Sequence, residues 1–189
     1  MRVLLSFVFI SFCGILSGQN DMEWLLNKAI RLVEYKEKEE LSPVINQLTE
    51  LSNLQNIPVD DDASRDIIAA QIAVLNQKII VEPGQEFSFS EMGKALYRIK
   101  YQLALVNLRK ILKLNDDEFQ TILPQIASNI ESLSTSAISF EMDPNLISKF
   151  QRAENFFRNI KIGMVNNKKL KKGRGILTDT LMIASKVKY

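Results

Sequence analysis

The chain has 189 residues, of which 46 % are hydrophobic and 24 % charged, a composition typical of a globular protein that can bury a core. Its 24 basic and 22 acidic residues leave a formal net charge of +2. Only seven glycines and five prolines are present, which disfavours an all-β fold with many turns.

Residues 1–18 have the layout of a secretory signal peptide. Arg2 precedes an apolar run over residues 3–12, and small residues end at Gly18, where we expect the cut within one or two residues. A membrane anchor or a buried N-terminal helix is the alternative, but the run is short for a bilayer span. This layout predicts a secreted, extracellular protein. Because the only cysteine, Cys13, is removed with the signal peptide, we also predict that the secreted chain has no disulfide.

Apolar residues recur at helical spacing in three segments before residue 82. The first follows Asp21 as a cap and continues to Val33, and its tryptophan, Trp24, is assigned to packing. The second begins at Ser42–Pro43, a cap followed by a proline in the first helical position. The third reaches about residue 81 and starts in an acidic loop, which suits the helix dipole.

The stretch from Met92 to Leu114 has the longest helical periodicity of the chain and predicts a buried central helix about 35 Å long. A further helix begins at Asp116, and Pro124 should kink or split it. Residues 132–139 are rich in serine and threonine, so they are predicted to form a loop.

Asp143–Pro144 begins another helix. Residues 166–175 are basic and contain glycine, which predicts a loop, and residues 176–187 fit a short helix or a strand. The predicted fold is therefore all-α: a single-domain bundle of about five to seven helices around the central helix, over residues 19–165. Residues 166–189 would form a basic loop and a short C-terminal helix, packed on the bundle or trailing it.

Charge is unevenly distributed along the chain. Residues 145–189 hold eleven basic and two acidic side chains, a net charge of +9, whereas residues 19–144 carry −8. The densest basic segment, which resembles simple heparin-binding patterns, comprises Lys168, Lys169, Lys171, Lys172 and Arg174. It could be a solvated loop that balances the acidic part, a site for a sulfated glycan or an anionic membrane surface, or a processing site after Arg174.

The chain has no histidine and, after the predicted cut, no cysteine. These absences exclude Ser-His-Asp and Cys-His catalytic sites and most zinc sites. The alternating oxygen side chains from Asp60 to Asp66 resemble a calcium loop, but Arg65 occupies the position that needs glycine, so we assign them to helix capping. We assign no catalytic, cofactor-binding or metal-binding residue.

The expected function is that of a secreted, non-enzymatic helical protein that binds an extracellular protein partner or receptor, as a signalling ligand or effector does. Weak polyanion binding through the basic segment would accompany this activity, and no specific nucleic-acid partner is expected. The alternative is a carrier that holds a lipid or another apolar small molecule in a cavity between amphipathic helices.

Overall fold

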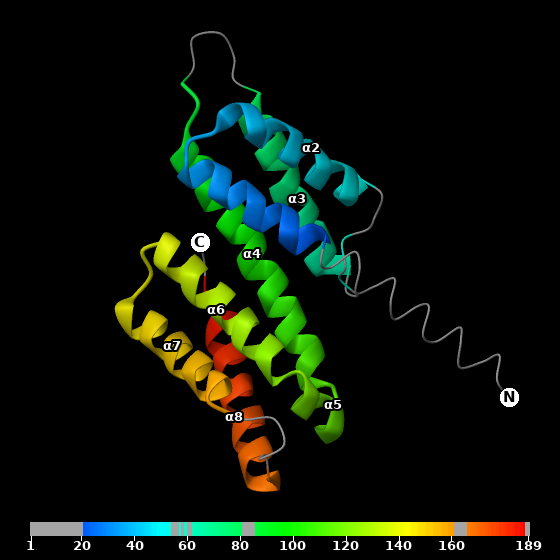
Figure 1. The fold of residues 1–189 in the computed structure, drawn as a ribbon, viewed down its shortest axis with the longest axis vertical. Helices are drawn as coiled ribbons and strands as arrows, with labels where there is room; N and C mark the ends of the chain where they lie inside the picture. Colours follow the sequence, from blue (N-terminus) through cyan, green and yellow to red (C-terminus); the bar gives the residue numbers. More distant parts are fainter. Residues whose placement is uncertain are drawn as a thin grey trace, which may run out of the picture. The chain divides into compact units, whose positions relative to one another are not determined.

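The structure, a computed structural model, describes residues 21–53, 57, 59, 62–80, 86–160 and 166–187. The predicted signal peptide, residues 1–18, lies outside the described residues. Every regular element within these ranges is a helix, which confirms the predicted all-α class (Figure 1). Eight helical stretches are described, so the prediction of five to seven was too low.

The first described helix covers residues 21–34 and has no label in Figure 1. It is followed by α2 (Lys38–Asn53), α3 (Asp62–Ile79), α4 (Phe89–Leu112), α5 (Asp116–Thr121), α6 (Leu123–Ser139), α7 (Pro144–Arg158) and α8 (Asn167–Ala184). The predicted start of the second helix at Ser42 was wrong, because the chain turns at Lys36, which has a positive φ of 60°, and α2 is already helical before Pro43.

The chain divides into two compact units, residues 1–99 and 100–189, and α4 contributes residues to both. Unit 1 contains the 21–34 helix, α2, α3 and the first part of α4, and unit 2 contains the rest of α4 and α5–α8. With 24 residues, α4 is the longest helix of the described ranges, as expected for the predicted central helix. It begins three residues before Met92 and ends two residues before Leu114.

Unit 1 buries the apolar sides of the 21–34 helix, α2, α3 and the first part of α4. Helix α2 packs against α3. The buried side chains recur every three or four residues and include Met22, Leu26, Ala29, Leu41, Ile45, Leu48, Ile68, Ile72, Leu75, Met92, Leu96 and Ile99. Burial of one large aliphatic side chain is worth about 1.5–3 kcal/mol, so this core can stabilise the unit without a disulfide.

Unit 2 has a core of aromatic and aliphatic side chains from α4 to α8. Its largest members are Tyr101, Phe119, Phe150 and Phe157, each at most 1 % exposed. The hydroxyl of Tyr101 donates a hydrogen bond to the carbonyl of Ala184 at 2.9 Å, which ties the end of α8 to α4. Helix α7 packs against both α6 and α8.

The predicted effect of Pro124 is confirmed, because α5 ends at Thr121 and α6 begins at Leu123 with the proline in its first turn. The prediction of a loop over residues 132–139 was wrong, since α6 continues to Ser139. Hydroxyls in this stretch bond to carbonyls four residues earlier, as Ser136 does to Ser132 at 2.7 Å. The hydroxyls of Ser132, Thr135 and Ser136 are thus satisfied within the helix, while its apolar side continues into the core.

Candidate binding surfaces

The basic segment predicted as a loop forms the first half of α8. The side chain of Asn166 caps this helix by accepting a hydrogen bond from the backbone N–H of Lys169 at 2.9 Å. Leu170 and Leu177 lie on its buried side, two turns apart. The loop prediction was wrong because apolar side chains at helical spacing outweigh the lysines and glycines between them.

Four lysines lie on one side of α8, and we call this surface the basic face. At 100° per residue, Lys168, Lys169, Lys171 and Lys172 span an arc of about 160°. All four are exposed, and none of them forms an ion pair within the ranges that the structure describes. Lys172 also lies over the ring of Phe156, with 5.3 Å from its Nζ to the centroid. The face therefore presents four positive charges to solvent.

The fifth predicted residue, Arg174, belongs to a different environment. Its guanidinium donates hydrogen bonds to the carbonyls of Leu112 at 3.2 Å and Leu114 at 2.7 Å, where α4 ends. It also pairs with Asp116 at 2.9 Å and lies 4.4 Å above the ring centroid of Phe119. The structure thus brings together four of the five predicted residues and gives Arg174 partners within unit 2.

The electrostatics of α8 oppose the lysines of the basic face. These four lysines lie in the first two turns of α8, where the helix dipole favours acidic side chains. The first turn holds no acidic residue that would offset them. Lys168 is three and four residues from Lys171 and Lys172, and like charges at these spacings cost a few tenths of a kcal/mol per pair. Such local conflicts are expected where a surface is kept for function rather than for stability.

A hollow of about 380 Å³ follows the basic face along α8, between α8 and α7, and opens to solvent. Three of its lining residues, Phe150, Ala153 and Thr180, are buried. The remaining lining residues are Ile176, Met182 and Ile183 with the charged Lys149, Arg152 and Asp179. Met182 is 51 % exposed, and its flexible thioether can adapt to a partner surface. Sequence reasoning missed this hollow because its residues come from two helices whose pairing no local pattern reveals.

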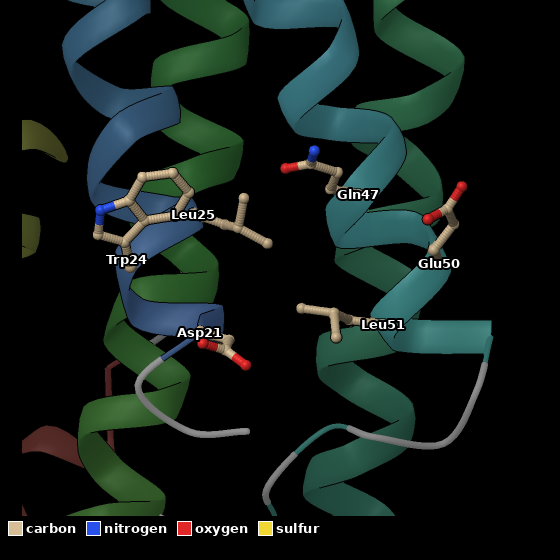
Figure 2. Close-up of a pocket in the computed structure, with 6 residues that line it drawn as sticks. All are labelled: Asp21, Trp24, Leu25, Gln47, Glu50 and Leu51. Carbon is tan, nitrogen blue, oxygen red and sulfur yellow. The ribbon is translucent and has the colours of Figure 1, made fainter. Parts of the chain in front are cut away.

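A second hollow lies in unit 1, between the 21–34 helix and α2, and has a volume of about 330 Å³ (Figure 2). Trp24 borders it and is 59 % exposed, so the assignment of this tryptophan to packing was wrong. Leu25 and Leu51 project into the space between the two helices in Figure 2. The exposure of Trp24 was detectable, since it lies opposite to the buried positions of its helix.

Within the described ranges, no group of three acidic, histidine or cysteine side chains could hold a metal ion. Asp60 of the calcium-like stretch lies outside these ranges, and Asp62 pairs with Arg65 at 2.7 Å. No helix among the described residues is long and apolar enough to cross a membrane. No protein-family model, no curated protein and no solved structure matches this chain.

Proposed function

We propose that this chain is a secreted, non-enzymatic helical protein that acts by binding an extracellular protein partner, as a signalling ligand or effector does. The observation that supports this proposal is the exposed basic face of α8 beside the apolar hollow between α7 and α8. A surface with an apolar centre and a charged border is the usual anatomy of a protein-binding site. The four lysines favour a partner with acidic groups.

The basic face also supports weak binding of a polyanion, such as a sulfated glycan or an anionic membrane surface. At physiological ionic strength the Debye length is about 8 Å, so a bound polyanion senses mainly this local cluster. Arg174 does not take part, because its guanidinium bonds to the end of α4 and to Asp116.

Chromatography on heparin tests the contribution of the basic face. Replacing Lys168, Lys169, Lys171 and Lys172 together with serine should abolish retention and leave the helical circular dichroism spectrum unchanged. The matched control removes the same charge from exposed lysines at scattered positions, namely Lys38, Lys94, Lys113 and Lys186. This control should lose only a small part of the retention.

The salt dependence provides a second measure of the same interaction. If heparin behaved like duplex DNA, four neutralised contacts would give a log–log salt slope of about −3.5. Sulfated glycans differ from DNA in charge spacing, so the test compares the salt slopes of wild type and the variants rather than one absolute slope. If the scattered control lost as much retention as the basic-face variant, binding would depend on overall charge and the assigned site would be wrong.

The hollow offers a test of protein binding. A photo-crosslinking amino acid at Met182 should capture an extracellular protein from the fluid into which the chain is secreted, and excess unlabelled protein should compete. The captured protein, once purified, should bind wild type at least tenfold more tightly than the Ile183→Asp variant, because a charge in the hollow would remain unpaired in the complex. Equal affinity would exclude the hollow as the binding site.

A carrier of apolar molecules receives less support from this geometry. Carrier sites bury about 70–90 % of a small ligand, whereas the two described hollows open to solvent. Native mass spectrometry of the secreted protein distinguishes the two functions. A protein-binding ligand should appear at the mass of the chain alone, and a carrier should appear with co-purified small molecules.

A further inference from the structure

The 21–34 helix presents an exposed face that the core of unit 1 does not use. Asp21, Trp24, Lys28, Arg31 and Tyr35 are all exposed and lie within an arc of about 80°. Trp24 is 59 % and Tyr35 is 74 % exposed. The Nζ of Lys28 lies 5.3 Å from the centroid of the tryptophan ring. Tryptophan, tyrosine and arginine are the residue types that dominate binding energy in protein interfaces.

This face has an acidic residue, Asp21, at one end and a basic residue, Arg31, at the other, so two copies of it can pair opposite charges when they run antiparallel. If two copies of the helix cross antiparallel about the midpoint between Trp24 and Lys28, Asp21 of each copy lies opposite Arg31 of the other. The same alignment places Trp24 opposite Lys28, which adds a cation–π contact on each side. A parallel alignment would instead place Asp21 against Asp21 and Arg31 against Arg31, which is repulsive.

The hollow beside Trp24 fits this antiparallel arrangement (Figure 2). It lies at the Asp21 end of the face, which the Arg31 end of the second copy would approach. Its carboxylates, Asp21 and Glu50, can pair with that arginine, and its leucines can contact the ring of Tyr35. The face is therefore complementary to itself, which a two-fold dimer requires because both subunits use the same surface.

We propose that a second copy of this chain docks antiparallel on the exposed face of the 21–34 helix and forms a two-fold dimer. A helix of 14 residues is about 21 Å long, so the contact is smaller than the interface of about 1,200 Å² that stable complexes need. The dimer is therefore weak and forms reversibly with increasing concentration. It uses a surface in unit 1 and does not depend on the partner binding proposed for unit 2.

Sedimentation equilibrium over protein concentrations from about 10 µM to 1 mM, a range suited to such a small interface, should show reversible dimerisation. Trp24 is the only tryptophan, so its emission should shift to shorter wavelength as the dimer forms. The Trp24→Ala variant should remain monomeric over this range. The control Ile138→Ala alters another exposed apolar side chain, which is in unit 2, and should dimerise like wild type.

Charge exchange tests the antiparallel geometry. Asp21→Lys and Arg31→Asp should each weaken dimerisation by about tenfold, because each creates two like-charge contacts across the two-fold axis. The double variant Asp21→Lys/Arg31→Asp should recover most of this loss but not all of it, because the pairs between residues 21 and 31 re-form with exchanged charges while Glu50 then faces an aspartate. A protein that stays monomeric at 1 mM, a dimer that persists in Trp24→Ala, or a double variant without rescue would each overturn the proposal. The basic-face variant should dimerise normally, which separates this result from the heparin result.

Discussion

Arg174 is close in sequence to the lysines of the basic face but has a different environment in the folded protein. Its neighbours Lys171 and Lys172 are exposed, whereas its own side chain is 24 % exposed and bonds to two carbonyls and one carboxylate. The planar guanidinium can serve several acceptors at once, which a lysine cannot. The arginine therefore donates hydrogen bonds at the C-terminal end of α4, where helical carbonyls lack partners within the helix.

Replacing Arg174 with alanine should lower the free energy of unfolding by about 2–3 kcal/mol, because hydrogen bonds from a charged group are worth about 1.5–3 kcal/mol and the exposed pair with Asp116 adds little. Urea denaturation measures this loss. The Arg174→Lys variant should recover only part of it. Heparin retention should not change in either folded variant. A loss of retention as large as that of the basic-face variant would place the arginine in the binding site.

Tyr97 links stability to alkaline pH. Burial and the neighbouring charge of Glu34, whose Oε1 accepts a hydrogen bond from the tyrosine hydroxyl at 3.3 Å, raise the pKa of Tyr97 above 10.0. Because the folded protein holds the proton more tightly than the unfolded chain, this contribution to the free energy of unfolding is complete below pH 10. It is lost as the pH rises through the raised pKa of the folded state.

Urea titrations between about pH 8 and 11, across the ordinary tyrosine pKa, should show stability falling at the alkaline end. In the Tyr97→Phe variant that fall should be smaller, since the ring remains but the titrating hydroxyl is gone. The exposed Tyr35 provides the control, and Tyr35→Phe should keep the alkaline loss of wild type. An identical alkaline loss in Tyr97→Phe would show that this residue does not carry the linkage.

The helices whose apolar periodicity is strong were predictable from the sequence, and those that interrupt it with polar residues were not. The long helix α4 and the break at Pro124 are confirmed, because each depends on a local signal that packing reinforces. The serine-rich end of α6 and the basic half of α8 depend on contacts with other helices. Those contacts override weak local propensity, and the sequence alone does not reveal them.

The candidate surfaces were predictable to a smaller extent. The four lysines of the basic face were identified by composition, but their alignment on one side required the helical conformation of α8. The hollow between α7 and α8 required the pairing of two helices. Trp24 was misassigned because tryptophan usually packs, although its helical phase already placed it on the exposed side.

The two glycines of α8 form a matched pair that tests how this helix packs. A Cβ added at Gly173 would lie 3.3 Å from the ring of Phe157, whereas one added at Gly175 would meet nothing within 4 Å. Alanine stabilises a helix interior by about 0.5–1 kcal/mol relative to glycine. Gly175→Ala should therefore raise the free energy of unfolding by this amount.

In Gly173→Ala the close contact with Phe157 should cancel part or all of the same gain, and Gly173→Val should destabilise the protein. Urea denaturation of the three variants compares them under one condition. Destabilisation by Gly175→Ala would contradict a helical backbone at that position. An equal gain at both glycines would contradict the close approach of α8 to the phenylalanine ring.

At the scale of the whole molecule, charge divides along the same boundary as the two units. Residues 19–99 hold eight basic and fourteen acidic side chains, a net charge of −6, and residues 100–189 hold fifteen and eight, a net charge of +7. The net charge of +2 for the full chain conceals this contrast. A polyanion that approaches the basic face therefore meets a unit that is positive as a whole, which supports binding there.

The N-terminal apolar segment, residues 1–18, should be absent from the secreted protein. We expect cells that secrete the protein to release a chain that begins at or within two residues of Gln19, because the layout of residues 1–18 is that of a signal peptide. Mass spectrometry of the N-terminal peptide measures the cut, and a chain that begins at Gln19 can cyclise with loss of ammonia. Since Cys13 is removed, a reducing agent should leave the unfolding transition unchanged. Replacing Leu5 and Val8 with arginine should block secretion, whereas secreted protein that retains Met1 would contradict the prediction.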